Sequence, residues 1–205
     1  MLSSEYVYLR NAKAGKWTVV TEAREGARFF TEMPNAEPGA RAGASTDKTI
    51  WKVSARSSHE ENGWGTPYLQ GAPSAAKGTG KGYSSKGNST ADTEEWIEID
   101  LGSEHALKGM TLHPRMDTRD LQGGSAGFPV DYQIEARTAR GEYRTIAGAH
   151  NMGNPRGKPV AHDFYTVVGF PTARFLRLRA TRLGSPASDE PAIYRLQFSG
   201  IEVQW

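Results

Sequence analysis

Residues Trp96–Gly102 read Trp-Ile-Glu-Ile-Asp-Leu-Gly, and this stretch decides the fold class. The aliphatic residues Ile97, Ile99 and Leu101 alternate with two carboxylates, so that one side of the segment is apolar and the other is polar. Successive side chains of a β-strand point to opposite faces, and this alternation is therefore typical of a strand with one buried face in an antiparallel sheet.

The same period of two recurs over much of the chain. Runs with this pattern occupy residues 128–136, 164–170, 175–180 and 194–205. The last run changes parity at Ser199-Gly200, which predicts a β-bulge. No window has the three- and four-residue apolar repeat of a helix. Short strands joined by Gly- and Pro-rich connections predict an all-β sandwich or barrel.

The chain divides into two parts of different composition. Three short strands are expected over Tyr6–Arg10, Trp17–Glu22 and Ala27–Met33. Residues 34–49 are rich in Pro, Gly and Ala and predict a linker, so residues 1–49 form an N-terminal β extension or the edge of a neighbouring domain. Residues 50–205 form the main domain, in which the Gly-rich segment 71–88 predicts an irregular loop.

Composition excludes several classes of protein. The 205 residues include no Cys, so a disulfide framework, a thiol nucleophile and Cys-ligated metal sites are absent. A net charge of +2 gives no reason to expect a nucleic-acid partner. No stretch reaches the length of a transmembrane helix, and the first residues contain no recognisable signal peptide.

The motifs of catalysis are incomplete. Gly123–Gly127 matches the G-x-S-x-G pattern, but a polar loop precedes the Ser and a strand follows it, whereas a nucleophile elbow needs a strand and then a helix. Gly78–Gly82 lacks the spacing and the Ser/Thr of a phosphate-binding loop. The five His are scattered and provide no pair at metal-ligand spacing. We therefore expect a binding module and not an enzyme.

Several segments resemble the discoidin domain, also called the coagulation factor 5/8 type C domain, and within it the bacterial family 32 carbohydrate-binding modules. The segments that carry the resemblance are Trp51–Ser58, Trp96–Gly102, Leu107–Arg115, Phe128–Arg137, Glu142–Ile146, Ala173–Leu178 and Ile201–Val203. The resemblance implies a galactose-binding-domain-like jelly roll of about eight antiparallel strands, in agreement with the all-β prediction made from periodicity.

The resemblance also implies a ligand site in the loops at one end of the sandwich. Arg115 occupies the family's Pro-Arg position, with Asp117, Arg119 and Asp120 as neighbouring candidates. A guanidinium can hydrogen-bond two vicinal sugar hydroxyls at once. The competing interpretation is that Arg115 forms a structural salt bridge with Asp117 or Asp120.

Three aromatic residues are candidates for stacking on a sugar ring. Trp64 and Tyr68 follow the first strand of the main domain, and Tyr83 lies in the Gly-rich segment. An exposed aromatic face suits the C–H surface of a galactose-like ring. The alternative for Trp64 and Tyr68 is that they cap the end of the sandwich.

Many members of the family hold a structural calcium ion. The two positions at which they have anionic ligands are Gln70 and Gly200 in this sequence. Because calcium requires carboxylate or carbonyl oxygens, the loss of both charges predicts a weak or absent calcium site, and no metal or other cofactor is assigned.

The resemblance implies a non-catalytic module that targets a larger bacterial extracellular enzyme, such as a glycoside hydrolase or a sulfatase, to galactose-type or other neutral sugars. The expected partner is a glycan, and the expected location is secreted, periplasmic or cell-surface. Two alternatives remain: a cell-adhesion or lipid-surface-binding discoidin domain, and a purely structural domain within an enzyme. The absence of Cys argues against the animal lipid-binding members, whose termini are usually joined by a disulfide.

Overall fold

The computed structural model describes residues 6–11, 16–21, 28–29, 51–71, 73, 81–166 and 168–205. Contacts divide the chain into two compact units, residues 1–43 and 44–205. In the first unit, β1 (Tyr6–Asn11), β2 (Lys16–Thr21) and β3 (Arg28–Phe29) form an antiparallel sheet in that order, which confirms the three predicted strands. The predicted linker over residues 34–49 lies outside the described residues.

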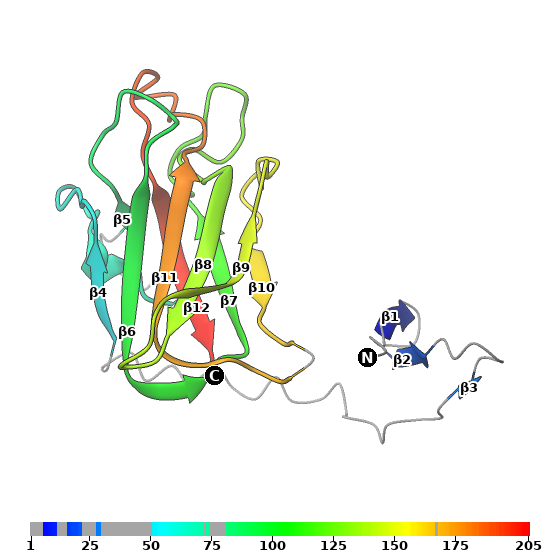
Figure 1. The fold of residues 1–205 in the computed structure, drawn as a ribbon. Helices are drawn as coiled ribbons and strands as arrows, with labels where there is room; N and C mark the ends of the chain where they lie inside the picture. Colours follow the sequence, from blue (N-terminus) through cyan, green and yellow to red (C-terminus); the bar gives the residue numbers. More distant parts are fainter. Residues whose placement is uncertain are drawn as a thin grey trace. The chain divides into compact units, whose positions relative to one another are not determined.

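The second unit is a sandwich of two antiparallel sheets (Figure 1), which confirms the predicted jelly-roll architecture. The five-stranded sheet has the order β4-β6-β11-β8-β9, and the four-stranded sheet has the order β10-β7-β12-β5. The strands are β4 (Lys52–Ala55), β5 (Tyr83–Ser84), β6 (Glu95–Ala106), β7 (Gly109–Pro114), β8 (Asp131–Arg137), β9 (Arg144–Ala149), β10 (Val160–Asp163), β11 (Thr172–Arg182) and β12 (Gln197–Gln204). One 3-10 turn, η1 (Thr66–Tyr68), interrupts the connection between β4 and β5.

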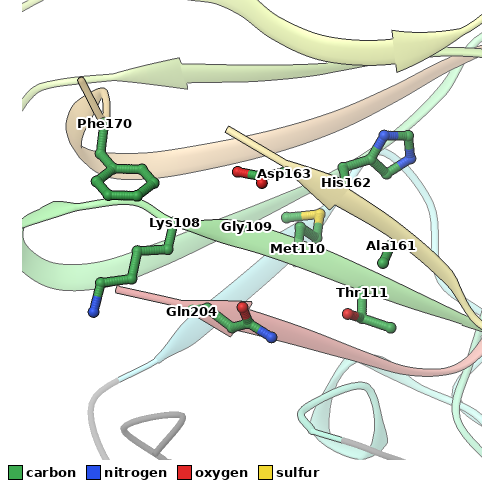
Figure 2. A pocket seen from close by; sticks show the side chains of 9 residues that line it. All are labelled: Lys108, Gly109, Met110, Thr111, Ala161, His162, Asp163, Phe170 and Gln204. Carbon is green, nitrogen blue, oxygen red and sulfur yellow. The ribbon is translucent and has the colours of Figure 1, made fainter. Parts of the chain in front are cut away.

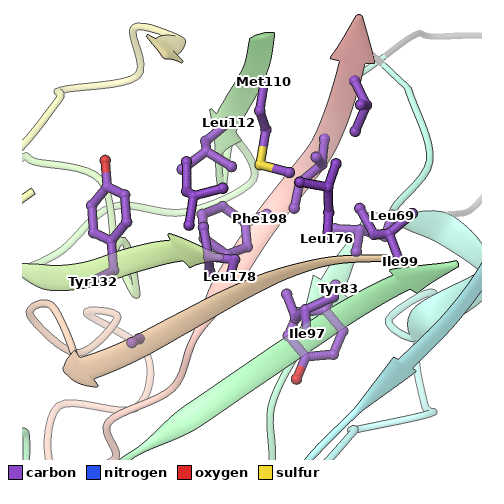
Figure 3. Close-up of a cluster of buried hydrophobic side chains, with 14 of the residues drawn as sticks. Leu69, Tyr83, Ile97, Ile99, Met110, Leu112, Tyr132, Leu176, Leu178 and Phe198 are labelled. Carbon is purple, nitrogen blue, oxygen red and sulfur yellow. The ribbon is translucent and has the colours of Figure 1, made fainter. Parts of the chain in front are cut away.

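Alternation along the strands supplies the core between the two sheets (Figure 3). Within β6, Ile97, Ile99 and Leu101 are buried while the residues between them are half-buried on the outer face. The opposing sheet contributes residues such as Leu112 and Phe198. Burying an aliphatic or aromatic side chain of this size stabilises the fold by about 1.5–3 kcal/mol. The sequence pattern therefore identified the buried face of β6 correctly.

Two local features of the strands differ in how well they were predicted. The register between β12 and β7 shifts between Phe198 and Gly200, which confirms the predicted bulge. The run over residues 164–170 is not a strand, and that prediction was wrong. Thr166 and Gly169 exchange backbone hydrogen bonds of 3.1 and 2.9 Å in a tight turn, and Gly169 has φ +102°. The chain therefore reverses in the middle of the alternating run.

The connections fall at two opposite ends of the sandwich (Figure 1). At the loop end, segments 85–94, 115–130 and 183–196 gather; Ser188 N donates to Arg119 O and Leu183 N donates to Ala91 O, both at 2.8 Å. At the other end, the short β6–β7 connection meets the β10–β11 connection, where Leu107 N donates to Pro171 O at 2.8 Å. We refer to these as the loop end and the turn end.

Candidate binding site at the loop end

Arg115 stands at the centre of a polar cluster at the loop end, directly after β7. Its Nε donates to Asp117 Oδ1 at 2.6 Å, and a second nitrogen donates to Asp117 Oδ2 at 3.3 Å. The remaining terminal nitrogen donates to Gln197 Oε1 at 3.2 Å. Only 5% of Arg115 is exposed. The guanidinium is thus held in a planar ion pair, as the structural alternative predicted, and offers little surface to a ligand.

The indole of Trp64 forms the floor beneath this ion pair. The guanidinium carbon of Arg115 lies 4.9 Å from the ring centroid and Lys81 Nζ lies 6.0 Å from it. Trp64 is placed by a backbone hydrogen bond of 2.9 Å from Gly65 N to Gly82 O, and it is 6% exposed. The side-chain cations of Arg115 and Lys81 therefore lie against the Trp64 ring on which a sugar was predicted to stack. Trp64 caps the end of the sandwich.

The carboxylate of Asp117 is partly exposed to solvent. Lys81 Nζ lies 3.4 Å from its Oδ2, and Arg115 is bound on the other side. Burial alone would raise the pKa of Asp117, but the hydrogen bond and charge of Arg115, together with Lys81, hold that pKa below its usual value. Asp189 Oδ2, 3.8 Å from Arg115, adds a second exposed carboxylate. The cluster thus presents fixed acceptors and one ammonium donor to solvent.

Tyr83 does not have the predicted role in this structure. Its side chain is fully buried in the core, and its hydroxyl donates to Ser57 O at 2.6 Å. Burial, and secondarily the charges of Glu95 and Glu60, raise the pKa of the Tyr83 hydroxyl. A ring without an exposed face cannot stack on a sugar. Tyr68 lies in η1 and is half-buried.

Asp120 and Arg119 differ in burial: Asp120 is buried and has a structural role, whereas Arg119 is exposed. Asp120 is buried and accepts hydrogen bonds from Gln122 N at 3.0 Å and Gly124 N at 2.6 Å, which close the loop on itself. Arg119 is exposed, and its backbone carbonyl accepts a hydrogen bond from Ser188 N. The structure therefore brings Arg115, Asp117 and Trp64 together but leaves Asp120 as an internal loop brace.

The rejected hydrolase motif has a structural role. Ser125 is fully buried, and its Oγ accepts a hydrogen bond from Gly157 N at 2.7 Å. Among the described residues, no helix follows this Ser, as a nucleophile elbow would require.

The two positions considered for calcium do not fit a metal. Gln70 uses its amide to donate to Trp51 O at 3.1 Å, so a donor group stands where a cation would need an acceptor. Gly200 packs on the backbone of Gly71, and a Cβ at this position would lie 2.1 Å from Gly71 O. Within the described part of the chain, no group of three or more His, Asp or Glu side chains is arranged to hold a metal ion.

Two residues of the cluster were missed by the sequence analysis. Lys81 lies within Gly78–Gly82, which the sequence analysis weighed only as a phosphate-binding loop, and its charge was the available signal. Gln197 lies 82 positions from Arg115, and no local pattern connects the two. Long-range pairing of β12 with the remainder of its sheet determines this contact.

The second unit has the fold of several solved carbohydrate-binding modules. Solved structures with the same fold include the Clostridium perfringens module CpGH89CBM32-5 in complex with GalNAc-β-1,3-galactose, at TM-score 0.55 and 16% identity over 77% of this chain and 97% of that one. CBM32-3 from a family 31 glycoside hydrolase of the same organism gives TM-score 0.53 at 16% identity, covering 77% of this chain and 92% of that one. The family 32 module of C. perfringens NanJ, in complex with galactose, gives 0.50 at 16% identity, covering 76% and 94% respectively.

At these identities the structural likeness shows the fold, and sequence comparison shows the family. No curated protein matches the chain. None of the helical segments in the described part of the chain is long and apolar enough to cross a membrane. The F5/8 type C domain family matches residues 44–191, which is more than half of the sequence. The chain therefore belongs to the F5/8 type C domain family.

Proposed function

We propose that this chain is a non-catalytic carbohydrate-binding module whose loop end binds a galactose-type or other neutral sugar. The module would direct a larger bacterial extracellular glycan-degrading enzyme to its substrate. The observation that carries the proposal is the exposed carboxylate of Asp117, which is fixed between Arg115 and Lys81 at the loop end of a sandwich of this family.

The geometry supports hydrogen bonding without ring stacking. Asp117 Oδ2 accepts from sugar hydroxyls and Lys81 Nζ donates to them, while Arg115 positions the carboxylate from below. A carboxylate that is already oriented loses little side-chain entropy on binding. A hydrogen bond to a charged group contributes about 1.5–3 kcal/mol, so a few such contacts correspond to a Kd of roughly 1 mM.

The structural relatives agree with this class of ligand. CpGH89CBM32-5 and the NanJ module were each solved with a galactose-containing ligand or with galactose itself. Weak binding suits a targeting role, because a tethered module of millimolar affinity raises the concentration of its enzyme at a polymeric glycan.

A titration followed by two-dimensional 1H–15N NMR tests the proposal. The probes are galactose, N-acetylgalactosamine and GalNAc-β-1,3-galactose. We expect at least one of them to shift the indole signal of Trp64 and the amide signal of Asp117 with a Kd near 1 mM. The Asp117→Ala variant should bind at this site at least tenfold more weakly.

Glu142→Ala is the matched control. This variant also removes one exposed carboxylate, but Glu142 lies in the β8–β9 connection, outside the loop end. Loop-end shifts in Glu142→Ala should equal those of the parent chain. Unmoved Trp64 and Asp117 signals with all three sugars, or equal affinity in Asp117→Ala, would contradict the proposed site.

Binding to a lipid surface is the second candidate function. Met116 and Leu121 are exposed apolar side chains in the loop that contains Asp117, with Arg119 between them. Sedimentation with phosphatidylserine-containing vesicles separates the two functions. A sugar-binding module stays in the supernatant; pelleting of the parent chain that Leu121→Asp abolishes would favour the lipid function.

A further inference from the structure

We propose that a hollow at the turn end is a second binding site, which takes a single neutral pyranose residue. The hollow measures about 260 Å³ and surrounds Gly109, and its functional lining is Lys108, Thr111, Asp163, Phe170 and Gln204. It surrounds Gly109 at the opposite end of β7 from Arg115, and six residues of strand separate the two by roughly 20 Å. It therefore shares no residue with the site at the loop end.

A missing side chain opens the hollow. Gly109 pairs with Asp163 of β10 on one side and with Gln204 of β12 on the other. A Cβ on Gly109 would lie 2.7 Å from His162 O, so the strand pairing itself requires glycine here. The side chains of Asp163 and Gln204 consequently flank a position of β7 that carries no side chain. Lys108 N donates to Gln204 O at 2.8 Å and fixes the rim.

One wall of the hollow is an aromatic ring with an accessible face. The tight turn at Thr166 and Gly169 presents Phe170, which is 40% exposed. Tyr165 supports the Phe170 ring edge-on, with centroids 5.2 Å apart and planes at 71°. Figure 2 shows Phe170 at one side of the hollow and the carboxylate of Asp163 near its centre. Of the aromatic residues predicted at the loop end, Trp64 and Tyr83 have no comparable open face.

The polar groups around this ring are not engaged with one another. Among the described residues, Lys108 Nζ, the Gln204 amide and the Thr111 hydroxyl have no hydrogen-bond or ion-pair partner. Asp163 uses Oδ1 to accept from Tyr165 N at 3.0 Å, and its Oδ2 has no such partner in the described structure. Donors and acceptors are therefore both available, and one ammonium balances one carboxylate.

These properties define the ligand class. A charge-balanced site does not select an anion or a cation, whereas a neutral polyol can satisfy its donors and acceptors together. The exposed ring adds an apolar surface suited to the C–H face of a pyranose. Pockets for drug-sized molecules measure about 300–1,000 Å³, so the smaller volume here limits the ligand to one ring.

NMR titration of the 15N-labelled chain tests the inference residue by residue. The probes are glucose, galactose, N-acetylglucosamine and fucose, each added alone. We expect at least one of them to shift the amides of Gly109, Thr111 and Gln204 progressively, with a Kd in the millimolar range. The Phe170→Ala variant should weaken this binding at least tenfold, and Gln204→Ala should weaken it severalfold.

Two controls separate a site from an indirect effect. Val168 is 93% exposed in the same turn and is not part of the lining, so Val168→Ala should bind like the parent chain. Asp117→Ala should leave the Gly109, Thr111 and Gln204 shifts unchanged, because the two proposed sites are independent. The inference is overturned if none of the four sugars shifts these amides, or if Phe170→Ala, with an otherwise unaltered spectrum, binds as before.

Discussion

The two ends of the sandwich contain similar chemical groups in opposite states. At the loop end, Arg115 is bound by Asp117 and Gln197, and the Trp64 ring is covered by cations. At the turn end, the side-chain ammonium of Lys108 has no partner among the described residues, and the ring of Phe170 is exposed. The loop end is thus organised by its own contacts, whereas the turn end leaves its contacts available to a ligand.

The difference shows that residue type alone does not define a binding residue. An Arg next to an Asp satisfies itself when the two lie two positions apart at the end of a strand, as Arg115 and Asp117 do. The ligand is then left with the outer rim of the cluster. A hollow beside a glycine between two strands has the reverse property, because the glycine has no side chain to engage the polar groups around it.

The largest expected effect concerns the role of Arg115. If the loop end is organised by its ion pair, Arg115→Ala should lower the free energy of unfolding by about 3 kcal/mol, because Asp117 and Gln197 lose their partner. Urea unfolding measures this change. Arg119→Ala, an exposed charge in the same loop, should alter stability by less than about 0.5 kcal/mol. Equal effects of the two variants would refute the distinction between them.

A smaller effect is expected when the turn-end hollow is filled. Gly109→Ala places a methyl group against the carbonyl of His162 in a paired strand and should cost about 2 kcal/mol in the free energy of unfolding. The comparison variant is Gly153→Ala, because a Cβ there meets no atom within 4 Å. Thermal unfolding of both variants would show whether the hollow is a rigid feature; unchanged stability of Gly109→Ala would show that β7 and β10 can separate locally.

Tyr83→Phe tests the reassignment of Tyr83 from a ligand-binding residue to the core. The variant removes the buried hydroxyl that donates to Ser57 O and should cost about 1 kcal/mol in the free energy of unfolding. Sugar-induced NMR shifts should not change. Loss of sugar binding with unaltered stability would show that Tyr83 is a ligand-binding residue and would contradict its assignment to the core.

The smallest expected effect is a difference in the pH at which each end of the sandwich loses stability. The folded-state pKa of Asp117 is lowered, so its stabilisation is complete above the unfolded value near 4 and is lost as the pH falls below it. Burial lowers the pKa of His162 at the turn end. The stability that neutral His162 contributes is therefore complete above the unfolded value near 6.5 and is lost as the pH falls below it, which is a higher pH than for Asp117. The free energy of unfolding, measured by urea denaturation from pH 7 to pH 3, should therefore fall in two stages. The His162→Gln variant should lack the first stage, which is the one at higher pH.

The sequence predicted what depends on local alternation and missed what depends on distant pairing. Ile97, Ile99 and Leu101 are buried as expected, and the bulge lies at Gly200. The run ending at Phe170 was misassigned because alternation is also produced by a turn whose apolar side chains face solvent. That error concealed three exposed apolar side chains, Tyr165, Val168 and Phe170, and with them the hollow.

The candidate site was predicted in part for the same reason. The Arg115–Asp117 pair is local and was foreseen as one of two alternatives. The burial of Tyr83 follows from pairing of β5 with β12, which no pattern near Tyr83 reveals.

A crystal structure of the chain grown with galactose tests the central claim most directly. The account predicts a galactose at the loop end, with hydroxyl oxygens within hydrogen-bond distance of Asp117 Oδ2 and Lys81 Nζ and with the Arg115–Asp117 ion pair intact. A galactose bound only elsewhere on the chain, or one that displaces Arg115 from Asp117, would contradict it.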